Sequence, residues 1–256
     1  MSGRTWSYPA AIRQRRPHSA SYIGCAKSIW HLHDETVNIW THLIAFAIFC
    51  TAYFRVYIRH RRKWTDGVCA QSLYLPAASC FFLCSTLYHT FANHDNATYW
   101  QCLDHCGITA FMWASSRSFT ILAYGHQRTA ARQYVVVLTA TALLLVFWSL
   151  YNIATWNSQI RIAYHAGYGA FAALPAFSHP SSLHWRTTRG RQKLLGNFRA
   201  LVLISAMGGI LYAMKCIERM IDAKADWGDV DHHAMHMAVV IGACIYGCEL
   251  LCEDFA

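Results

Sequence analysis

The chain of 256 residues contains seven apolar stretches with few charged side chains inside them. Each stretch has roughly the 20 residues that a helix needs to cross the hydrocarbon core of a bilayer. We therefore expect an all-α fold, a bundle of seven transmembrane helices. The predicted spans are residues 39–58, 68–90, 103–124, 134–152, 160–177, 199–217 and 232–250.

The composition agrees with a membrane protein and argues against a soluble or nucleic-acid-binding protein. Only 14% of the residues are charged, whereas about a quarter of the residues of a soluble domain are charged. The formal net charge is +9, but the basic residues lie between the apolar stretches, where lysine and arginine contact lipid headgroups. The eleven cysteines contain no C-x-x-C pair, and we interpret them as packing residues. We expect an integral membrane protein with no nucleic-acid partner.

The predicted spans form one helical domain, because no repeat or linker separates them. The first 35 or so residues are polar and basic, without the apolar core of a cleavable signal peptide. Within them, the stretch from Ser21 to His33 carries Tyr22 and Trp30, which suit the headgroup zone and predict a short interfacial helix. We divide the chain into an N-terminal segment, a transmembrane domain and a short C-terminal tail, at residues 1–38, 39–252 and 253–256.

Two histidines, His232 and His236, lie four positions apart where the last span begins. Positions i and i+4 share one face of a helix, so both imidazoles can reach one metal ion. In a bundle of seven spans, the end of the second span and the starts of the third and seventh lie on the side of the N-terminus. His89 ends the second span and Asp104 begins the third. We therefore expect both residues at the membrane depth of the histidine pair.

Three imidazoles around one open position are typical of a catalytic zinc site. We predict that His89, His232 and His236 bind zinc (Zn2+), which would activate water near neutral pH. Asp104 would accept a hydrogen bond from that water, as a general base or as an orienting group. Ser85 lies one turn before His89, where its hydroxyl would support the water or a ligand carbonyl.

Alternatives remain open for these residues. An isolated histidine near the end of a membrane helix is more often an interfacial or hydrogen-bonded residue, although ionisable residues inside spans are costly and often functional. His233 points about 100° away from its neighbour on a helix, so we expect it to face the interface or an adjacent helix. Competing metal ligands near the predicted site are His94, Cys102, His105 and Cys106.

The sequence from Glu35 to Leu43 reads E-T-V-N-I-W-T-H-L and closely resembles the E-T-x-N-I-W-T-H-L signature of the progestin and adipoQ receptor family. This family includes the adiponectin receptors, the fungal zinc-homeostasis membrane proteins and, more distantly, the haemolysin III proteins. The family's S-x-x-x-H, L-D-x-x-G and H-x-x-x-H motifs follow in order, so that the resemblance covers about residues 27–250. These motifs are carried by Ser85 and His89, by Leu103, Asp104 and Gly107, and by His232 and His236.

The resemblance implies a seven-helix protein with a cytosolic N-terminus and a zinc ion just inside the cytosolic leaflet. Its ligands would be His89, His232 and His236, with Asp104 near the zinc-bound water. The positive-inside rule favours the opposite orientation, because nine lysine and arginine residues lie on the N-terminal side and twelve on the other side. We follow the motif match and expect a multi-pass protein of the plasma membrane or an endomembrane, with its N-terminus in the cytosol.

The chain departs from the family where the last span begins. Relatives typically place serine before the first histidine of the last pair and glutamine after it, whereas Asp231 and His233 stand here. Asp231 would orient an imidazole, alter the acidity of the water or recruit a second metal; alternatively, it belongs to a solvated acidic loop. The other acidic residues of that loop are Asp222, Asp226 and Asp229.

Arg117 is the one basic residue well inside a predicted span. It lies roughly 20 Å beyond Asp104 along the helix, towards the opposite leaflet. It either extends outward to the interface or binds a lipid headgroup or a carboxylate at the far end of the bundle.

The family is similar in design to the alkaline ceramidases, which implies a role in lipid signalling or metabolism. Our leading hypothesis is a receptor-like protein with amide hydrolysis, in which zinc-activated water attacks a ceramide-like lipid and releases a fatty acid and a sphingoid base. A second hypothesis is a non-catalytic receptor with structural zinc and an extracellular ligand. A third is a regulator of zinc or lipid homeostasis. These hypotheses differ on whether the protein is an enzyme.

Overall fold

The computed structural model describes residues 16–60, 65–124, 129–152, 157–177, 188–220 and 229–252. Over these ranges the chain is helical, and its only extended contact is an isolated bridge between Ser19 and His94. The predicted all-α class is confirmed. The helices are α2 (Tyr22–Ser28), α3 (Thr36–Arg59), α4 (Asp66–Thr90), α5 (Ala97–Tyr124), α6 (Thr129–Tyr151), α7 (Ser158–Phe177), α8 (Thr188–Met214), α9 (Cys216–Met220) and α10 (Val230–Cys252).

The seven long helices fall on the predicted spans, but each begins earlier than the apolar pattern indicated, and α5 and α8 differ most. Helix α5 begins at Ala97 rather than at residue 103, and α8 begins at Thr188 rather than at residue 199. The added turns are polar, and a polar turn lowers hydropathy without preventing a helix. Because α5 begins early, Asp104 lies two turns inside the helix, about 10 Å from its start.

Five of the described helices are long and apolar enough to cross a membrane, namely α3, α4, α6, α8 and α10. Helices α5 and α7 fall outside this group, because polar side chains such as Arg117 and His165 lower their hydropathy. Leucine and phenylalanine side chains on α6 face outward, with Phe147 67% exposed, as a lipid-contacting surface requires. The protein is therefore a multi-pass membrane protein, and the count of seven crossings stays a prediction.

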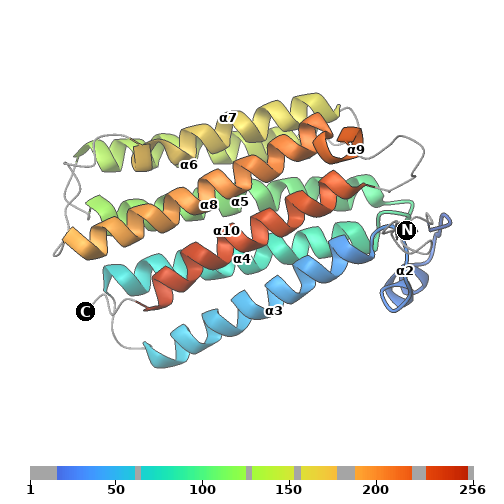
Figure 1. The fold of residues 1–256 in the computed structure, drawn as a ribbon, viewed down its shortest axis with the longest axis horizontal. Coiled ribbons are helices and arrows are strands. Elements are labelled where there is room, and N and C mark those ends of the chain that lie inside the picture. Colours follow the sequence, from blue (N-terminus) through green and yellow to red (C-terminus); the bar gives the residue numbers. More distant parts are fainter. Residues whose placement is uncertain are drawn as a thin grey trace, which may run out of the picture.

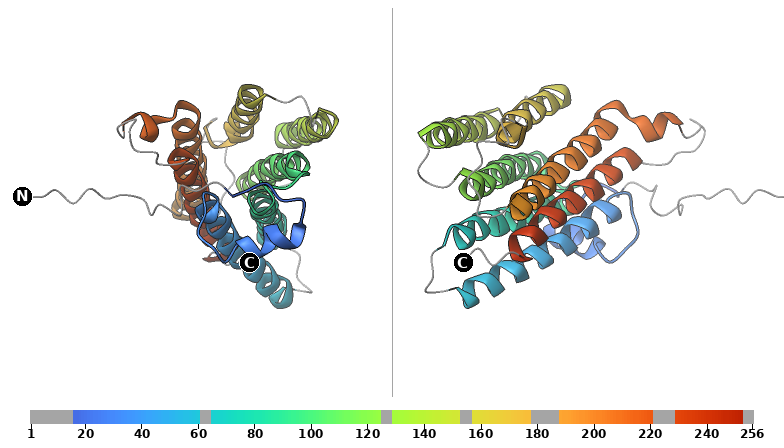
Figure 2. Two further views of the ribbon diagram at one scale, coloured as in Figure 1. Left: turned by 90° about the vertical axis from the view of Figure 1, so that its right-hand side faces the viewer. Right: turned by 60° about the vertical axis from the view of Figure 1, so that its left-hand side comes forward.

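The long helices lie side by side along the longest axis of the molecule (Figure 1). Helix α4 packs between α3 and α5, and α10 packs on α8, α3 and α4. Helices α6 and α7 both pack on α5, on the side away from α3 (Figure 2). The short helices α2 and α9 lie at one end of the bundle, where α4 ends and α10 begins (Figure 1).

The core lies between α3, α4, α5, α8 and α10 and contains two fully buried tyrosines, Tyr74 and Tyr246. The hydroxyl of Tyr74 donates to the carbonyl oxygen of Ala243 at 2.8 Å, and that of Tyr246 lies 3.1 Å from the hydroxyl of Ser118. A buried hydroxyl without a partner is costly. These two bonds therefore tie α4 and α5 to α10.

Helices α8 and α10 approach each other closely at two glycines. A Cβ atom at Gly208 would lie 2.7 Å from the Cβ atom of Ala238, and one at Gly242 would lie 3.1 Å from the carbonyl oxygen of Leu201. Small residues permit such close packing of membrane helices. The contact at Gly208 fixes the first half of α10, which carries the histidine pair.

A strap, defined as residues 16–35, precedes α3 and lies across the end of the bundle where α4 ends. Arg16 anchors it by donating to the carbonyl oxygen of Thr90 at 3.0 Å. The predicted interfacial helix is present as α2, which has seven residues and ends before the predicted limit at His33. Its place at a membrane interface stays a prediction. The predicted C-terminal tail, residues 253–256, lies outside the described residues.

Candidate metal centre

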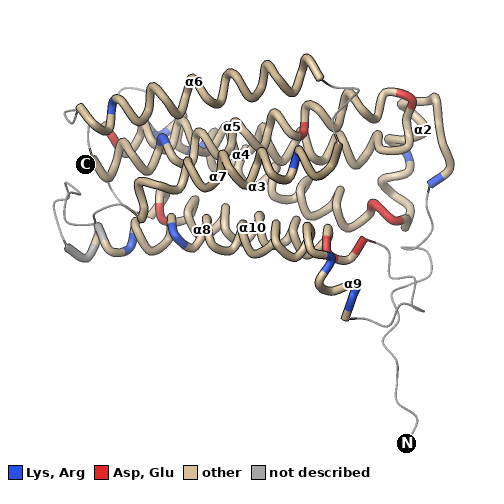
Figure 3. The backbone as a smooth tube through the Cα atoms, turned by 90° about the horizontal axis from the view of Figure 1, so that it is seen from above, with Lys and Arg blue, Asp and Glu red and all other residues tan. Residues whose placement is uncertain are grey.

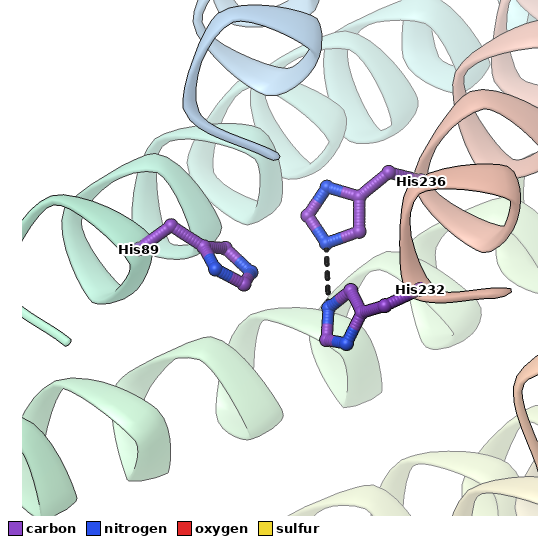
Figure 4. A group of neighbouring side chains, drawn as sticks. All are labelled: His89, His232 and His236. Atoms are coloured by element: carbon purple, nitrogen blue, oxygen red, sulfur yellow. Dashed lines mark hydrogen bonds between the residues drawn. The ribbon is translucent and has the colours of Figure 1, made fainter. Parts of the chain in front are cut away.

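The structure brings His89, His232 and His236 together at the end of the bundle that carries α2 and α9. One ring nitrogen of each residue lies within 4.8 Å of those of the other two. His89 belongs to the last turn of α4, and the other two belong to the first two turns of α10 (Figure 4). The predicted convergence of the three side chains is therefore present in the fold, whereas zinc binding stays a prediction.

The three rings are spaced as ligands of one metal ion would be. The Nε2 atoms of His232 and His236 lie 3.0 Å apart, and the His89 ring lies edge-on to both, with centroid distances of 5.2 and 4.7 Å. Nitrogen ligands about 2.0–2.1 Å from a tetrahedral zinc ion lie roughly 3.4 Å from one another. Small side-chain movements are enough to reach that spacing.

His89 presents a ring nitrogen that suits a metal. Its Nδ1 lies 2.7 Å from the Oε2 atom of Glu35, so Nδ1 carries the proton and donates it to the carboxylate. Its Nε2 is buried and has no hydrogen-bond partner among the described residues. A buried acceptor without a partner costs free energy, and a zinc ion bound by three imidazoles would satisfy it. The residues present therefore fit zinc.

The sequence prediction missed the contact between Glu35 and His89. Glu35 also accepts a hydrogen bond from Nδ2 of Asn38 at 2.8 Å. Burial raises the pKa of Glu35, but the hydrogen bonds that the carboxylate accepts from His89 and Asn38 lower that pKa to about 2. The carboxylate is therefore ionised at neutral pH. Both Glu35 and Asn38 belong to the E-T-V-N part of the signature, which by itself did not indicate their contacts.

The aspartates before α10 differ from the prediction. Asp231 is fully buried and accepts hydrogen bonds from the backbone N–H groups of Ile217 and Glu218, at 2.9 and 3.0 Å. It therefore caps the start of α9. The interpretation as a solvated loop residue is wrong, whereas its roles in orienting an imidazole, altering the acidity of the water or recruiting a second metal stay predictions. Asp229 instead approaches the cluster, with Oδ2 3.3 Å from Nδ1 of His232. The other acidic residues of the predicted loop, Asp222 and Asp226, lie outside the described residues.

The two residues predicted to act in catalysis are both buried. Asp104 lies on α5, which packs on α4. Its Oδ1 atom has no hydrogen-bond partner among the described residues. Ser85 is also buried, one turn before His89 on α4. The catalytic roles of Asp104 and Ser85 stay predictions.

A fourth buried histidine, His42 on α3, packs on the cluster. Its ring stacks on that of His236 with the centroids 3.9 Å apart, and it lies edge-on to Phe81 and Phe82. His42 is part of the signature, but its position in the sequence indicates no role for it. The contact depends on how closely α3 approaches α10, for which the sequence carries no signal.

The competing ligands on α5 have partners away from the cluster. Nδ1 of His105 lies 2.9 Å from Nε2 of His165 on α7. The thiol of Cys102 donates to the carbonyl oxygen of Ser149 at 3.4 Å, and Cys106 lies one turn further along α5. These side chains join α5 to its neighbours and do not complete the group of three histidines.

Two further histidines bind the strap. Nε2 of His94 lies 3.2 Å from the carbonyl oxygen of Ala20. Nε2 of His233 lies 3.3 Å from the carbonyl oxygen of Asp34, so this residue contacts the strap; its expected place at the interface or against an adjacent helix stays a prediction.

Arg117 is half-buried in the second half of α5. Its charge interacts with Cys69 in the first turn of α4, so it lies at the end of the bundle opposite the histidines. Both predicted roles of Arg117 stay predictions.

Most acidic residues that the structure describes gather at the histidine end of the bundle, whereas lysine and arginine lie at both ends (Figure 3). A local excess of negative charge attracts cations. This distribution favours a cation at the cluster. The acidic residues at that end are Asp34, Glu35, Asp95, Asp104, Glu218, Asp229 and Asp231.

Comparison with known proteins relates nearly the whole chain to one group of membrane proteins. Residues 30–246 match the model of a family described as "Haemolysin-III related". Progestin and adipoQ receptor-like protein 1 of Caenorhabditis elegans is 28% identical over 90% of this chain and 54% of its own length. The adiponectin receptor protein of Drosophila melanogaster is 26% identical over 91% and 54%, and the ADIPOR-like receptor IZH2 of Saccharomyces cerevisiae is 27% identical over 88% and 73%. The chain thus spans about half the length of the first two relatives.

Proposed function

Because the chain belongs to the haemolysin-III related family, we propose that it is a zinc-containing, receptor-like membrane protein of lipid signalling or metabolism. The family assignment confirms the predicted resemblance to the progestin and adipoQ receptors. We propose further that the zinc site hydrolyses the amide bond of ceramide-like lipids. The substrate would reach the site from the bilayer that surrounds the helices.

One observation carries this proposal. Three imidazoles converge from α4 and α10, and the Nε2 atom of His89 is buried without a partner among the described residues. The carboxylate of Asp104 is buried on α5, and its Oδ1 atom has no partner among the described residues. Three nitrogen ligands with an acidic group nearby form the usual donor set of a hydrolytic zinc site.

The residues divide the chemistry among themselves. Zinc in such a site supplies a Lewis acid that activates water near neutral pH. Asp104 takes up the proton of the attacking water, and the hydroxyl of Ser85 donates to the oxyanion that develops on the amide carbonyl. Water adds across the C–N bond, the acyl group leaves as a fatty acid, and the nitrogen leaves as the amine of a sphingoid base.

The test combines metal analysis with lipid hydrolysis by the purified protein. We expect stoichiometric zinc in the wild type and release of fatty acid from ceramide. Asp104→Asn should keep its zinc and lose about 10²- to 10⁴-fold in rate, the usual contribution of a general base. A wild-type protein that is fully loaded with zinc and leaves ceramides and related amides intact would falsify the hydrolase proposal.

A second candidate is a receptor in which zinc is structural, and the names of the relatives, which are receptors, favour it. Zinc would then tie the end of α4 to the start of α10, and an extracellular ligand would shift their packing. In that case His89→Ala lowers the unfolding temperature, whereas Asp104→Asn leaves signalling unchanged. Loss of signalling in a folded, zinc-loaded Asp104→Asn variant would reject this candidate.

We also propose that all seven long helices cross the membrane and that the N-terminus lies in the cytosol. The membrane would be the plasma membrane or an endomembrane. The side-by-side arrangement of α3 to α8 and α10 supports this topology (Figure 1). An antibody should not label an epitope tag placed before residue 16 on intact cells. Labelling without permeabilisation would exclude a cytosolic N-terminus.

A further inference from the structure

Two of the three clustered histidines are each paired with a carboxylate through Nδ1. Oε2 of Glu35 lies 2.7 Å from Nδ1 of His89, and Oδ2 of Asp229 lies 3.3 Å from Nδ1 of His232. Both carboxylates stand just before the first turn of a helix, Glu35 before α3 and Asp229 before α10. Two separate parts of the chain thus reach the same cluster from outside.

This pairing determines which nitrogen of each ring faces the cluster. A neutral imidazole carries one proton, and a carboxylate that accepts from Nδ1 holds the proton there. The lone pair then lies on Nε2. Accordingly, Nε2 of His89 has no partner among the described residues, and Nε2 of His232 faces Nε2 of His236. A carboxylate paired with a histidine in this way orients the ring and raises its basicity as a metal ligand.

The two carboxylates also offset the charge of a bound metal. Three neutral imidazoles leave the charge of Zn2+ uncompensated, and a buried charge without a counter-charge is costly. Glu35 and Asp229 together supply two negative charges directly behind two of the rings. Orientation and charge compensation thus come from the same two side chains.

We propose that Glu35 and Asp229 are positioning residues of the metal centre, with Glu35 contributing more. This inference rests on the zinc site proposed above. The side chains of Glu35 and His89 are 23% and 3% exposed, compared with 52% and 16% for Asp229 and His232. Water screens an exposed pair and weakens it, so the longer and more exposed pair has the smaller effect.

The strap holds the backbone of His89 as well as its ring. Arg16 donates through Nη2 to the carbonyl oxygen of His89 at 2.5 Å and through Nη1 to that of Thr90 at 3.0 Å. Asn38 in the first turn of α3 donates to the same oxygen of Glu35 that His89 contacts. Glu35 is therefore held from two sides, which is the geometry that a positioning residue requires.

A cavity of about 240 Å³ lies beside Glu35 and is also lined by Arg16, Asp34 and Asn93. A small carboxylate such as acetate fits this volume. In Glu35→Ala, acetate can therefore enter the space that the side chain leaves, next to Nδ1 of His89. This gives a chemical test of the role of the carboxylate.

The experiment measures the zinc dissociation constant of the full chain in detergent, by competition with a chromophoric chelator. We expect Glu35→Ala to raise the dissociation constant about 10- to 100-fold, the usual effect of losing such a partner. Glu35→Gln keeps an acceptor oxygen without the charge and should raise it less, as should Asp229→Asn. The control is Glu218→Gln at the same end of the bundle, because Glu218 pairs with Lys215 at 3.0 Å; it should bind zinc like the wild type.

Two further readouts separate positioning from a general loss of structure. The visible spectrum of the Co2+-loaded protein should change in Glu35→Ala and return towards that of the wild type with acetate. Without metal, Glu35→Ala should still unfold cooperatively, at a temperature lowered by the loss of the hydrogen bonds from His89 and Asn38. If Glu35→Ala does not fold, the zinc dissociation constant of Asp229→Asn tests the proposal instead, because the side chain of Asp229 is exposed.

The outcomes distinguish this inference from the function on which it rests. Equal dissociation constants for the wild type, Glu35→Ala and Asp229→Asn overturn the positioning role and leave the zinc site intact. If Asp229→Asn is the only variant that folds, a zinc dissociation constant equal to that of the wild type also overturns the positioning role. A wild-type protein that binds no zinc overturns the metal site itself.

Discussion

Two groups of histidines face neighbouring sides of α5, and their differences indicate what separates a metal centre from a hydrogen-bonded pair. Asp104 is the residue of α5 predicted to act at the three-histidine cluster, whereas the next residue, His105, bonds with His165 of α7. In each group two ring nitrogens lie close together, 3.0 Å apart in the cluster and 2.9 Å apart in the pair. Adjacent residues of a helix point about 100° apart, so α5 separates the two groups.

The groups differ in their third member and in the charges around them. The cluster has His89 from another helix and two carboxylates, whereas the pair has no third ligand in the part of the chain that the structure describes. The charge of Arg161 acts on both rings of the pair, and a cation repels a metal ion. One N–H···N bond joins the two neutral imidazoles, and Nδ1 of His165 is left buried without a partner among the described residues. Contact between imidazoles is therefore not sufficient for a metal site, which also requires a third ligand and a counter-charge.

The largest expected effect comes from removing one ligand of the cluster. His236→Ala leaves only two imidazoles, and we expect its zinc affinity to fall by more than the roughly 100-fold that losing an outer partner costs. Metal analysis after dialysis measures the loss. His60→Ala, at the opposite end of α3, is the control and should keep its zinc. Wild-type zinc content in His236→Ala would contradict the assignment of the ligands.

A smaller effect is expected from the helix contact that places the cluster. A Cβ atom at Gly208 would lie 2.7 Å from that of Ala238 and 3.2 Å from the Cα atom of Met235, beside His236. Gly208→Ala must therefore push α10 away, which costs about 1–3 kcal/mol and should also weaken zinc binding.

Gly209 is the matched control for Gly208, because a Cβ atom there meets nothing within 4 Å. Gly209→Ala should unfold at the same or a higher temperature, since alanine favours a helix over glycine by about 1 kcal/mol. Thermal unfolding and zinc affinity of both variants make the comparison. Equal values for the two variants would disprove a tight contact between α8 and α10 at this point.

The cluster could be anticipated from the sequence because it depends on two regular properties. Helical periodicity places His232 and His236 on one face, and the alternation of spans across a membrane places His89 at the same end. Neither argument needs the details of packing. The helix limits were less predictable, because the polar first turns of α5 and α8 resemble loop residues in composition.

The surroundings of the cluster could not be anticipated, because they depend on how irregular segments fold back. Glu35 reaches His89 through the strap, and Asp229 reaches His232 from the residue before α10. Asp231 has the composition of a solvated loop residue, yet it is buried by the backbone of α9, to which it hydrogen-bonds. Sequence distance and residue type carry no information on such contacts.

The smallest expected effect comes from breaking the pair on the other side of α5. His165→Ala removes one hydrogen bond between α5 and α7, with a net value of about 0.5–1.5 kcal/mol, and leaves a buried polar atom of His105 without its partner. We expect a slightly lower unfolding temperature and an unchanged zinc content. The double variant His105→Leu, His165→Leu replaces both polar rings with apolar groups and should recover much of that stability. Loss of metal from His165→Ala would instead show that the pair is a second metal site. It would contradict the conclusion that a metal site requires a third ligand and a counter-charge. Unchanged zinc with reduced stability would mean that the same contact between imidazoles binds metal on one side of α5 and joins helices on the other.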